Sequence, residues 1–225
     1  MNNFLELKNI SKNFNTEKKI RVLNKLSYNF KKGKVYSLMG PSGSGKSTLL
    51  NLISLIDRPT NGSIKFDNTL VNFKENNKND IFRAKKIGIV YQQNNLLTDF
   101  TAFENLYLAS LSINDNKKMA MLKAKKLIKK IGLSNRSDHF PSQLSGGESQ
   151  RIAIARAIIN DPDIILADEP TGSLDIKTAM DIFDLLNNQK KPNRLIIFAT
   201  HNRFFAKKAD YLLELIDGSI KPTNV

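Results

Sequence analysis

Short runs of apolar residues, each of strand length, recur along the chain between segments with helical periodicity. They cover residues 35–39, 87–91, 164–167 and 195–199. Nearly every residue within a run is apolar, so the run has no polar face. Strands of this kind are typical of a parallel sheet that helices cover on both faces. The pattern therefore predicts an α/β fold with a mostly parallel central sheet.

Segments with helical spacing lie between these runs. One of them places four apolar residues on the same face, at Leu49, Leu52, Ile53 and Ile56. A proline at position 59 cannot continue that helix, so we expect it to stop at residues 57–59. Two further helices are expected, one over residues 146–159 and one that carries Ile176, Met180 and Phe183.

Two regions depart from this alternation. Apolar and polar positions alternate within residues 4–30, as at Leu26, Tyr28 and Phe30, which predicts strands. Helical patterns dominate residues 94–150, with an apolar stripe of Ala120, Ala124, Leu127, Ile128 and Ile131. We interpret this block as an insertion into the α/β core. We therefore expect one domain over residues 1–225, with a core from about 1–93 and 151–225 and a helical subdomain from 94–150.

Composition narrows the class of protein. The 225 residues are 40% hydrophobic, which suits a globular chain with a buried core. The sequence has no cysteine, no apolar run of the ~18–20 residues that span a bilayer, and no secretory signal in its first residues. These features predict a cytosolic protein. The net charge of 35 − 21 = +14 is compatible with nucleic acid, an anionic membrane surface or a nucleotide as ligand.

A glycine-rich segment follows the first apolar run. Residues 40–48 read GPSGSGKST and match G-x-x-x-x-G-K-[ST]. Glycines let backbone N–H groups approach phosphate oxygens, and the helix that begins near Lys46 adds its positive dipole end. Lys46 would reach the β- and γ-phosphates, and the Ser47 hydroxyl would bind Mg²⁺. We expect the whole loop to bind ATP, through Gly40, Pro41, Ser42, Gly43, Ser44, Gly45, Lys46, Ser47 and Thr48. A glycine-rich turn without a ligand is the alternative.

Two adjacent carboxylates follow the run at 164–167. Asp168 and Glu169 stand beyond the carboxyl end of a predicted strand, where open α/β sheets bind ligands. Asp168 would hold Mg²⁺, directly or through water, and Glu169 would orient or deprotonate the attacking water. An ordinary acidic strand exit is the alternative for an isolated pair, and the phosphate loop upstream favours the catalytic interpretation.

Residues 144–151, LSGGESQR, narrow the class of NTPase. Ser145 is a predicted helix cap, and the glycine N–H groups after it make a second anion-binding helix terminus. One ATP does not need two such sites from one chain. The segment resembles the signature motif of the ABC ATPases, and the resemblance extends over residues 4–220. It implies that four residues close over an ATP held by another copy of the chain: Ser145, Gly146, Gly147 and Glu148.

The resemblance also implies the architecture of that family. It consists of a P-loop NTPase core with a mostly parallel sheet, an N-terminal antiparallel β subdomain and an inserted helical subdomain. Gln92 would contact Mg²⁺ and sense the γ-phosphate, and Asp175 would communicate across the dimer. His201 would hydrogen-bond the γ-phosphate region, and Phe14 would stack on adenine. A surface role for Gln92, a structural role for His201 and a packing role for Phe14 stay open. The catalytic residues are then expected to be Glu169, His201 and Lys46.

Three positions depart from the usual pattern of the family. Ser149 replaces a longer polar or basic residue, Asn202 follows the histidine where Asp is frequent, and Phe14 replaces Tyr. None of them removes a phosphate, metal or water ligand, so we expect ATP hydrolysis.

Two stretches indicate a branch of the family. Residues 39–62 resemble the branch of macrolide exporters and lipoprotein-releasing complexes, and residues 95–106 and 139–143 resemble the lipoprotein-releasing ATPases more closely. A cell-division ATPase of the same branch resembles the chain less well. This resemblance implies a homodimer that uses ATP and Mg²⁺ to drive integral membrane permease subunits. Such a dimer is peripheral on the cytoplasmic face of the inner membrane. Residues 96–106 would lie near the permease, although packing within the helical subdomain also explains them.

Two other functions are alternatives. A non-transport ABC ATPase acting on nucleic acid or ribosomes would use the positive charge, which is densest in residues 117–130. That cluster fits one amphipathic helix with a solvated face, capped by Asp115, and the chain lacks the coiled-coil insertion or second ATPase domain of such relatives. We therefore expect no direct contact with nucleic acid. An interaction module with a dead site would not need Lys46, Asp168, Glu169 and His201 together.

Overall fold

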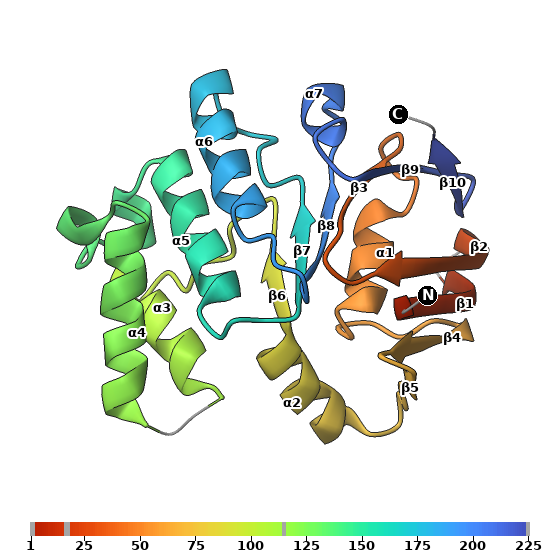
Figure 1. Ribbon diagram of the computed structural model, residues 1–225, viewed down its shortest axis with the longest axis horizontal. Coiled ribbons are helices and arrows are strands. Elements are labelled where there is room, and N and C mark those ends of the chain that lie inside the picture. Colours follow the sequence, from red (N-terminus) through yellow and green to blue (C-terminus); the bar gives the residue numbers. More distant parts are fainter. Residues whose placement is uncertain (1–2, 16–18, 114–115, 224–225) are drawn as a thin grey trace.

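The apolar runs of the sequence form strands of a six-stranded sheet in the computed structural model, which describes residues 3–15, 19–113 and 116–223 (Figure 1). The strand order is β10-β9-β3-β8-β7-β6. The strands are β3 (Val35–Met39), β6 (Ile87–Val90), β7 (Ile164–Asp168), β8 (Leu195–Ala199), β9 (Tyr211–Ile216) and β10 (Ser219–Thr223). The β9–β3–β8–β7–β6 pairs are parallel, and the β9–β10 hairpin is antiparallel. The prediction of a mostly parallel sheet is confirmed.

A second, antiparallel sheet of four strands has the order β2-β1-β4-β5. Its strands are β1 (Asn3–Asn15), β2 (Lys19–Lys31), β4 (Asn61–Phe66) and β5 (Thr69–Leu70). The alternation within residues 4–30 places Leu5, Leu7, Leu26 and Phe30 in the core. The expected N-terminal antiparallel β subdomain is therefore present.

Helices occupy the segments between the strands. They are α1 (Lys46–Ile53), α2 (Asn76–Lys86), α3 (Ala102–Leu111), α4 (Lys117–Lys130), α5 (Gly146–Ile158), α6 (Ile176–Asn187) and α7 (Arg203–Ala206), with 3₁₀ turns at Ser134–Arg136 and Pro141–Gln143. The N-cap of helix α4 is Asn116, whose side chain accepts the N–H of Met119. The expected cap, Asp115, lies outside the described residues. Within the described ranges, no helix has the length and apolar character to cross a bilayer.

Helix α1 ends earlier than the sequence predicts. Its last residue is Ile53, and Ile56 is 49% exposed rather than part of the buried face. The N–H of Ile56 donates to the carbonyl of Asn51, and the N–H of Leu55 donates to that of Leu52. These bonds form a Schellman motif around Leu55, which has a left-handed backbone with φ of 60°. The Schellman motif therefore ends the helix several residues before Pro59, so the proline is not what stops it.

The helix expected to carry Ile176, Met180 and Phe183 is present as α6, but only one of these three residues is buried. Ile176 is 80% exposed and Met180 is 41% exposed, whereas Phe183 is buried. The buried face consists of Ala179, Ile182, Phe183 and Leu186. The two stripes are neighbours on the helix surface, so helical spacing alone does not distinguish the one that packs on the sheet.

Three apolar clusters hold these layers together. The largest surrounds α1 between the two sheets, and includes Leu49 and Leu52. The second lies on the other face of the six-stranded sheet, around Phe183 and Phe198. The third joins α3, α4 and α5 and contains the residues Ala102, Leu106, Ala124, Ile128, Ile131, Leu133, Ile152, Ala155 and Ile159. The stripe predicted for residues 120–131 is thus the packing face of α4.

Helix α5 connects the helical region to the sheet. Its residues Ile152 and Ala155 belong to the third cluster, and Ile154 and Ile158 belong to the second. A Cβ at Gly88 of β6 would collide with the carbonyl oxygen of Ala157, so this strand and this helix are in backbone contact. The subdomain boundary near residue 150 runs through this helix and stays a prediction.

Candidate functional site

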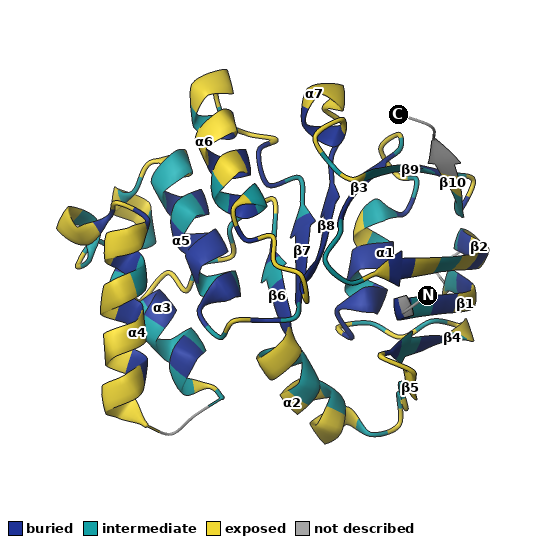
Figure 2. Ribbon diagram, in the orientation of Figure 1, coloured by how far each residue is buried: buried dark blue, intermediate teal, exposed yellow. Residues whose placement is uncertain are grey.

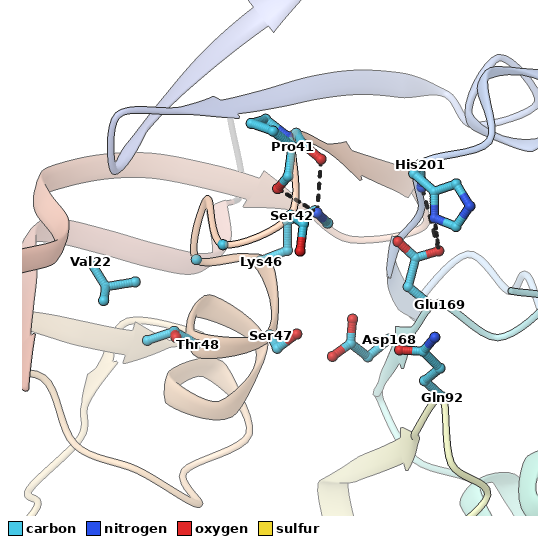
Figure 3. A pocket seen from close by; sticks show the side chains of 13 residues that line it. Val22, Pro41, Ser42, Lys46, Ser47, Thr48, Gln92, Asp168, Glu169 and His201 are labelled. Atoms are coloured by element: carbon cyan, nitrogen blue, oxygen red, sulfur yellow. Dashed lines mark hydrogen bonds and ion pairs between the residues drawn. The ribbon is translucent and has the colours of Figure 1, made fainter.

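A cavity of about 600 Å³ lies beyond the carboxyl ends of the parallel strands (Figure 3). β3, β8, β7 and β6 are neighbours in that order, so their last residues lie along one edge of the sheet. The cavity is lined by Val22, Gly40, Pro41, Ser42, Gly43, Gly45, Lys46, Ser47, Thr48, Gln92, Asp168, Glu169 and His201. All of these except Val22 are among the residues predicted from the sequence. Parallel pairing therefore brings together residues that are up to 161 positions apart, from Gly40 to His201.

The phosphate loop requires glycine at two of its positions. Gly40 has φ of 153°, and a Cβ there would lie 2.5 Å from the carbonyl oxygen of Leu215. Gly45 has φ of 98°, and a Cβ there would lie 2.8 Å from Cγ1 of Val22. Side chains at these positions would strain the backbone and collide with neighbouring strands.

The loop ends at an open helix terminus. Gly45 is the N-cap of α1 and supplies no side-chain hydrogen bond to the first turn. The first N–H groups of an α-helix have no partner within the helix, so those of Lys46, Ser47 and Thr48 are free to bind an anion. The ammonium of Lys46 donates to the carbonyl oxygens of Gly40 (2.8 Å) and Pro41 (3.1 Å), which holds it over the loop. The geometry suits a phosphate group at this terminus.

The acidic pair lies at the end of β7. Asp168 is the last residue of the strand, and the next residue, Glu169, has a left-handed backbone with φ of 46°. The N–H of Glu169 donates to the carbonyl of Ala199 on β8, at 3.0 Å. This turn aims the two carboxylates in different directions: Asp168 points toward Ser47, and Glu169 points toward His201 (Figure 3).

Glu169 and His201 are in direct contact. His201 Nδ1 lies 3.0 Å from Glu169 Oε2, and the backbone N–H of His201 donates to the same oxygen at 3.4 Å. The Glu169 side chain is 11% exposed, whereas that of His201 is 68% exposed. A nearly buried carboxylate beside an accessible imidazole, at the edge of a phosphate site, has the arrangement of a positioned general base.

The residues present fit a magnesium ion. The Ser47 hydroxyl, the Gln92 side-chain oxygen and the Asp168 carboxylate line the same cavity. Proteins commonly hold Mg²⁺ through one or two carboxylates together with phosphate oxygens of the substrate. In the described part of the chain, no group of three or more His, Asp or Glu side chains could hold a metal ion by itself. These residues therefore suit a magnesium ion whose remaining ligands come from the phosphate groups of a nucleotide.

The signature segment lies outside this cavity. Ser145 is the N-cap of α5, as predicted, and its hydroxyl accepts the N–H of Glu148 at 3.2 Å. The Glu148 carboxylate accepts the N–H of Ser145 (2.8 Å) and Nε of Arg136 (2.9 Å). The backbone hydrogen bond from Ser145, followed by that from Arg136, lowers the pKa of Glu148 from 4.5 to about 2. These residues therefore form a closed capping box, and none of them lines the cavity of its own chain.

The start of α5 packs against the start of α6. A Cβ at Gly147 would lie 2.5 Å from Cγ2 of Thr178, which leaves no room for a side chain. Asp175 is the N-cap of α6, and its carboxylate accepts the N–H of Thr178 at 3.0 Å. Hydrogen bonds from the hydroxyl and the N–H of Thr178 lower the pKa of Asp175. Gly147 of the signature segment and Asp175, the residue expected to communicate across the dimer, thus both contact Thr178.

Phe14 does not line the cavity. It lies on β1, is 40% exposed, and has the ammonium of Lys12 5.0 Å from its ring centroid. Val22 of β2 contributes to the cavity wall instead. Stacking of Phe14 on adenine stays a prediction.

Arg156 is a residue that the sequence reasoning missed. Its guanidinium donates to the backbone carbonyls of Asn94 (2.9 Å) and Asn95 (2.7 Å), in the segment that follows Gln92. Burial lowers the pKa of Arg156. The signal in the sequence is an arginine within the apolar run IAIARAII, because a charge in such a run needs partners inside the fold. Arg156 ties helix α5 to the loop that carries Gln92.

Comparisons with known proteins find relatives over nearly the whole chain. A family model described as ABC transporter matches residues 23–172. The "Lipoprotein-releasing system ATP-binding protein LolD" of Rickettsia bellii is 43% identical over 97% of this chain and 98% of that protein. The protein of the same name from Wigglesworthia glossinidia brevipalpis is 43% identical over the full length of both chains. The "Uncharacterized ABC transporter ATP-binding protein MJ1508" of Methanocaldococcus jannaschii is 40% identical over 96% of this chain and 97% of that protein.

Solved structures resemble the fold over the same length. The structure titled "Dimeric structure of a post-hydrolysis state of the ATP-binding cassette MJ0796 bound to ADP and Pi" has a TM-score of 0.90 and 37% identity. The alignment covers 98% of each chain. That relative was therefore captured as a dimer with the products of ATP hydrolysis.

Proposed function

The chain belongs to the ABC transporter family of ATPases, and on this basis we propose that it powers a complex that releases lipoproteins from the bacterial inner membrane. In this proposal two copies form a homodimer that acts on separate integral membrane permease subunits. The dimer is peripheral on the cytoplasmic face of that membrane. The resemblance stated from residues 95–106 and 139–143 and the names of the full-length relatives both support this cargo.

One observation carries the enzymatic part of the proposal. The phosphate loop, Gln92, the acidic pair and His201 line a single cavity, although they come from four separate segments. A binding module without hydrolysis would need the loop, and it would not need Glu169 in contact with His201. The arrangement therefore supports hydrolysis as well as binding.

Each residue has a role that follows from its position. The N–H groups of α1 and the ammonium of Lys46 hold the β- and γ-phosphates. Ser47, Gln92 and Asp168 would hold Mg²⁺, which supplies positive charge to the phosphate oxygens when it is bound. Glu169 orients the attacking water and accepts its proton, and His201 holds the Glu169 carboxylate in place and reaches the γ-phosphate region.

The location of the signature segment, Ser145–Gly147, supports a homodimer. Gly146 and Gly147 keep their N–H groups at a helix terminus, yet the terminus lies outside the cavity of the same chain. A second copy, rotated by a two-fold axis, can supply its Ser145–Gly147 segment to ATP held by the first. The dimeric state in the titles of two similar structures supports this arrangement. Closure around ATP and opening after hydrolysis would then move the permease.

The direct test of the enzyme is ATP turnover by the purified chain and by Glu169→Gln. Loss of a general base reduces turnover by roughly 100- to 10,000-fold. The variant keeps the phosphate loop, so its affinity for a fluorescent ATP analogue should be unchanged. Equal turnover by the variant and the wild type would refute the assigned role of Glu169.

The test of the cargo is purification of the tagged chain from its own membranes. A permease with few membrane-spanning helices and a large periplasmic domain, which stimulates turnover when lipoprotein is present, is the expected partner. A second candidate is an exporter of the macrolide type or a cell-division complex, because residues 39–62 resemble a branch of the family that is not limited to lipoprotein release. In that case a membrane partner co-purifies, and lipoprotein leaves turnover unchanged.

A further inference from the structure

Helix α4 carries a concentrated positive charge. Its sequence KKMAMLKAKKLIKK contains seven lysines, Lys117, Lys118, Lys123, Lys125, Lys126, Lys129 and Lys130, and no acidic residue. All seven lysines are exposed, and the helix forms an outer edge of the molecule, far from α1 (Figure 2). Half of the chain's net charge of +14 therefore lies on one helix of 14 residues.

Carboxylates of the described residues form no close ion pairs with these lysines. None of the seven ammonium groups forms an ion pair with an acidic side chain in the ranges that the structure describes. Helix α2, by contrast, pairs Arg83 with Asp80 and Lys86 with Asp163. Repulsion among seven unpaired lysines opposes helix formation, so the packing of the opposite face of α4 must offset it.

The packed face of α4 determines which side chains point outward. Ala120, Ala124 and Ile128 are buried against α3 and α5. At about 100° per residue, the positions roughly opposite Ala124 are 119, 122 and 126. They are occupied by Met119, Leu122 and Lys126, and the two apolar side chains are 46% and 53% exposed. The centre of the outer face is therefore partly apolar.

Five of the other six lysines flank this apolar centre, and Lys117 lies near the packed side of the helix. By the same helical spacing, Lys118, Lys125 and Lys129 lie on one side of it, and Lys123 and Lys130 lie on the other. A surface with two large apolar side chains between rows of lysines has the pattern of helices that lie in the headgroup layer of a membrane. The lysine stems can lie along the apolar layer while their ammonium groups reach the phosphates.

The same features count against nucleic acid as the occupant. The outer face has no arginine to bind bases or phosphates in a bidentate manner and no aromatic ring to stack on a base. Exposed Met119 and Leu122 would gain nothing against a phosphate backbone, whereas a bilayer removes them from water.

From charge and apolar content together, we propose that the outer face of α4 docks on a bilayer surface that contains anionic phospholipid. The ATPase then contacts the membrane directly, in addition to any contact through permease subunits. The inference goes beyond the proposed function, because it depends on the surface of α4 and not on the nucleotide site.

Co-sedimentation of the full-length chain with vesicles tests the proposal. Vesicles of phosphatidylcholine with about 30% phosphatidylglycerol should bind the chain, and vesicles of phosphatidylcholine alone should not. The variant Lys118→Gln/Lys125→Gln/Lys129→Gln keeps helix-forming residues and removes one row of charge. Its affinity for anionic vesicles should fall on the order of 100-fold, or about fivefold per lysine. The pair Met119→Gln/Leu122→Gln should weaken binding about tenfold through lost apolar burial.

The matched control removes three lysines elsewhere, in Lys8→Gln/Lys207→Gln/Lys221→Gln. These residues are exposed and belong to β1, the end of α7 and β10. The net charge changes by the same amount, because three lysines are replaced in each variant. The control should bind anionic vesicles within about threefold of the wild type. Equal losses in the two triple variants would overturn the proposal, because net charge alone would then explain binding. The proposal would also be wrong if the chain bound neutral and anionic vesicles equally well, or if it bound neither.

Two more measurements separate this inference from other ideas. If duplex RNA binds the chain through α4 and anionic vesicles do not, the occupant is nucleic acid and the proposal is wrong. ATP turnover of both triple variants should equal that of the wild type, because α4 is remote from the cavity. A chain that binds vesicles through α4 and lacks ATP turnover would refute the proposed function and leave this inference intact.

Discussion

The two glycine-rich helix termini of the molecule, those of α1 and α5, have different hydrogen bonding. At α1 the N-cap is Gly45, which offers the first turn no side-chain acceptor. At α5 the N-cap is Ser145, and a capping box with Glu148 satisfies part of the first turn. Arg136 holds the Glu148 carboxylate in this box. The terminus of α1 is therefore open to an anion, and that of α5 is already partly neutralised by its own chain.

This difference teaches that a serine-glycine-glycine cap and a phosphate loop are not equivalent anion sites. A carboxylate in the first turn of α5 interacts favourably with the helix dipole and reduces what an external phosphate would gain. The α1 terminus has no acidic residue in its first turn and adds the ammonium of Lys46. We expect α1 to provide most of the binding energy for a phosphate, and α5 to contribute only to an anion that is already held in place.

The largest effect should come from Lys46→Ala at the open terminus. Loss of a charged donor aimed at a phosphate reduces turnover by on the order of 1,000-fold. Affinity for a fluorescent ATP analogue should fall as well, since the ammonium contacts the ground state. Lys46→Arg is the control for charge without the right geometry. If Lys46→Ala turned over ATP at a rate within tenfold of the wild type, the α1 terminus would not be the main phosphate site.

The contact between the two helix starts gives the next largest effect. Gly147→Ala would place a Cβ 2.5 Å from Cγ2 of Thr178 and should lower the free energy of unfolding by about 2 kcal/mol. Thr178→Ser removes that methyl group and keeps the hydroxyl. The double variant should recover most of the loss in urea denaturation. A double variant as unstable as Gly147→Ala would show that the two residues do not meet.

Removal of the closed cap has a smaller effect. Ser145→Ala takes away the acceptor for the N–H of Glu148 and should destabilise the fold by about 1 kcal/mol. Ser142→Ala is a matched control, because Ser142 is exposed and precedes α5. Thermal unfolding should show a lower Tm for the first variant and an unchanged Tm for the control. Equal Tm values in both would mean that the capping box adds nothing.

The smallest effect is a dependence of stability on pH. Hydrogen bonds from Ser145 and Arg136 lower the pKa of Glu148 to about 2, below its ordinary value of 4.5. Its contribution to stability is therefore present above pH 4.5 and is lost as the pH falls toward 2. Partial exposure screens the interaction, so the contribution is about 1 kcal/mol. Between pH 6 and pH 3, the stability difference between wild type and Glu148→Gln should shrink. A constant difference would contradict the assignment.

Much of the nucleotide site could be predicted because its residues follow strands. A buried parallel strand shows in the sequence as an apolar run, and its carboxyl end marks the edge where ligands bind. That rule, together with the family resemblance, predicts Gln92, Asp168 and His201. Strand pairing then brings them to one cavity without further information.

Other features depend on contacts between distant segments. Val22 enters the cavity wall because Gly45 packs on it, and nothing near residue 22 in the sequence indicates this contact. The buried side of α6 depends on where the sheet lies, so helical spacing predicts the helix but not that Ala179 and Ile182 are the residues that pack. Arg156 has two backbone acceptors that are 61 and 62 residues away.

The strained residue at the end of α1 has a consequence for how the chain tolerates change. A left-handed backbone at a leucine costs about 1–2 kcal/mol, and Leu55 has φ of 60°. Its side chain is 8% exposed, and burial of a leucine returns about 1.5–3 kcal/mol. Glycine would relieve the backbone and leave a hole, so neither residue satisfies both demands. Leu55 is therefore a site of local frustration, where backbone strain and side-chain burial oppose each other with free energies of similar size. Substitution between leucine and glycine at this position should change the free energy of unfolding only slightly.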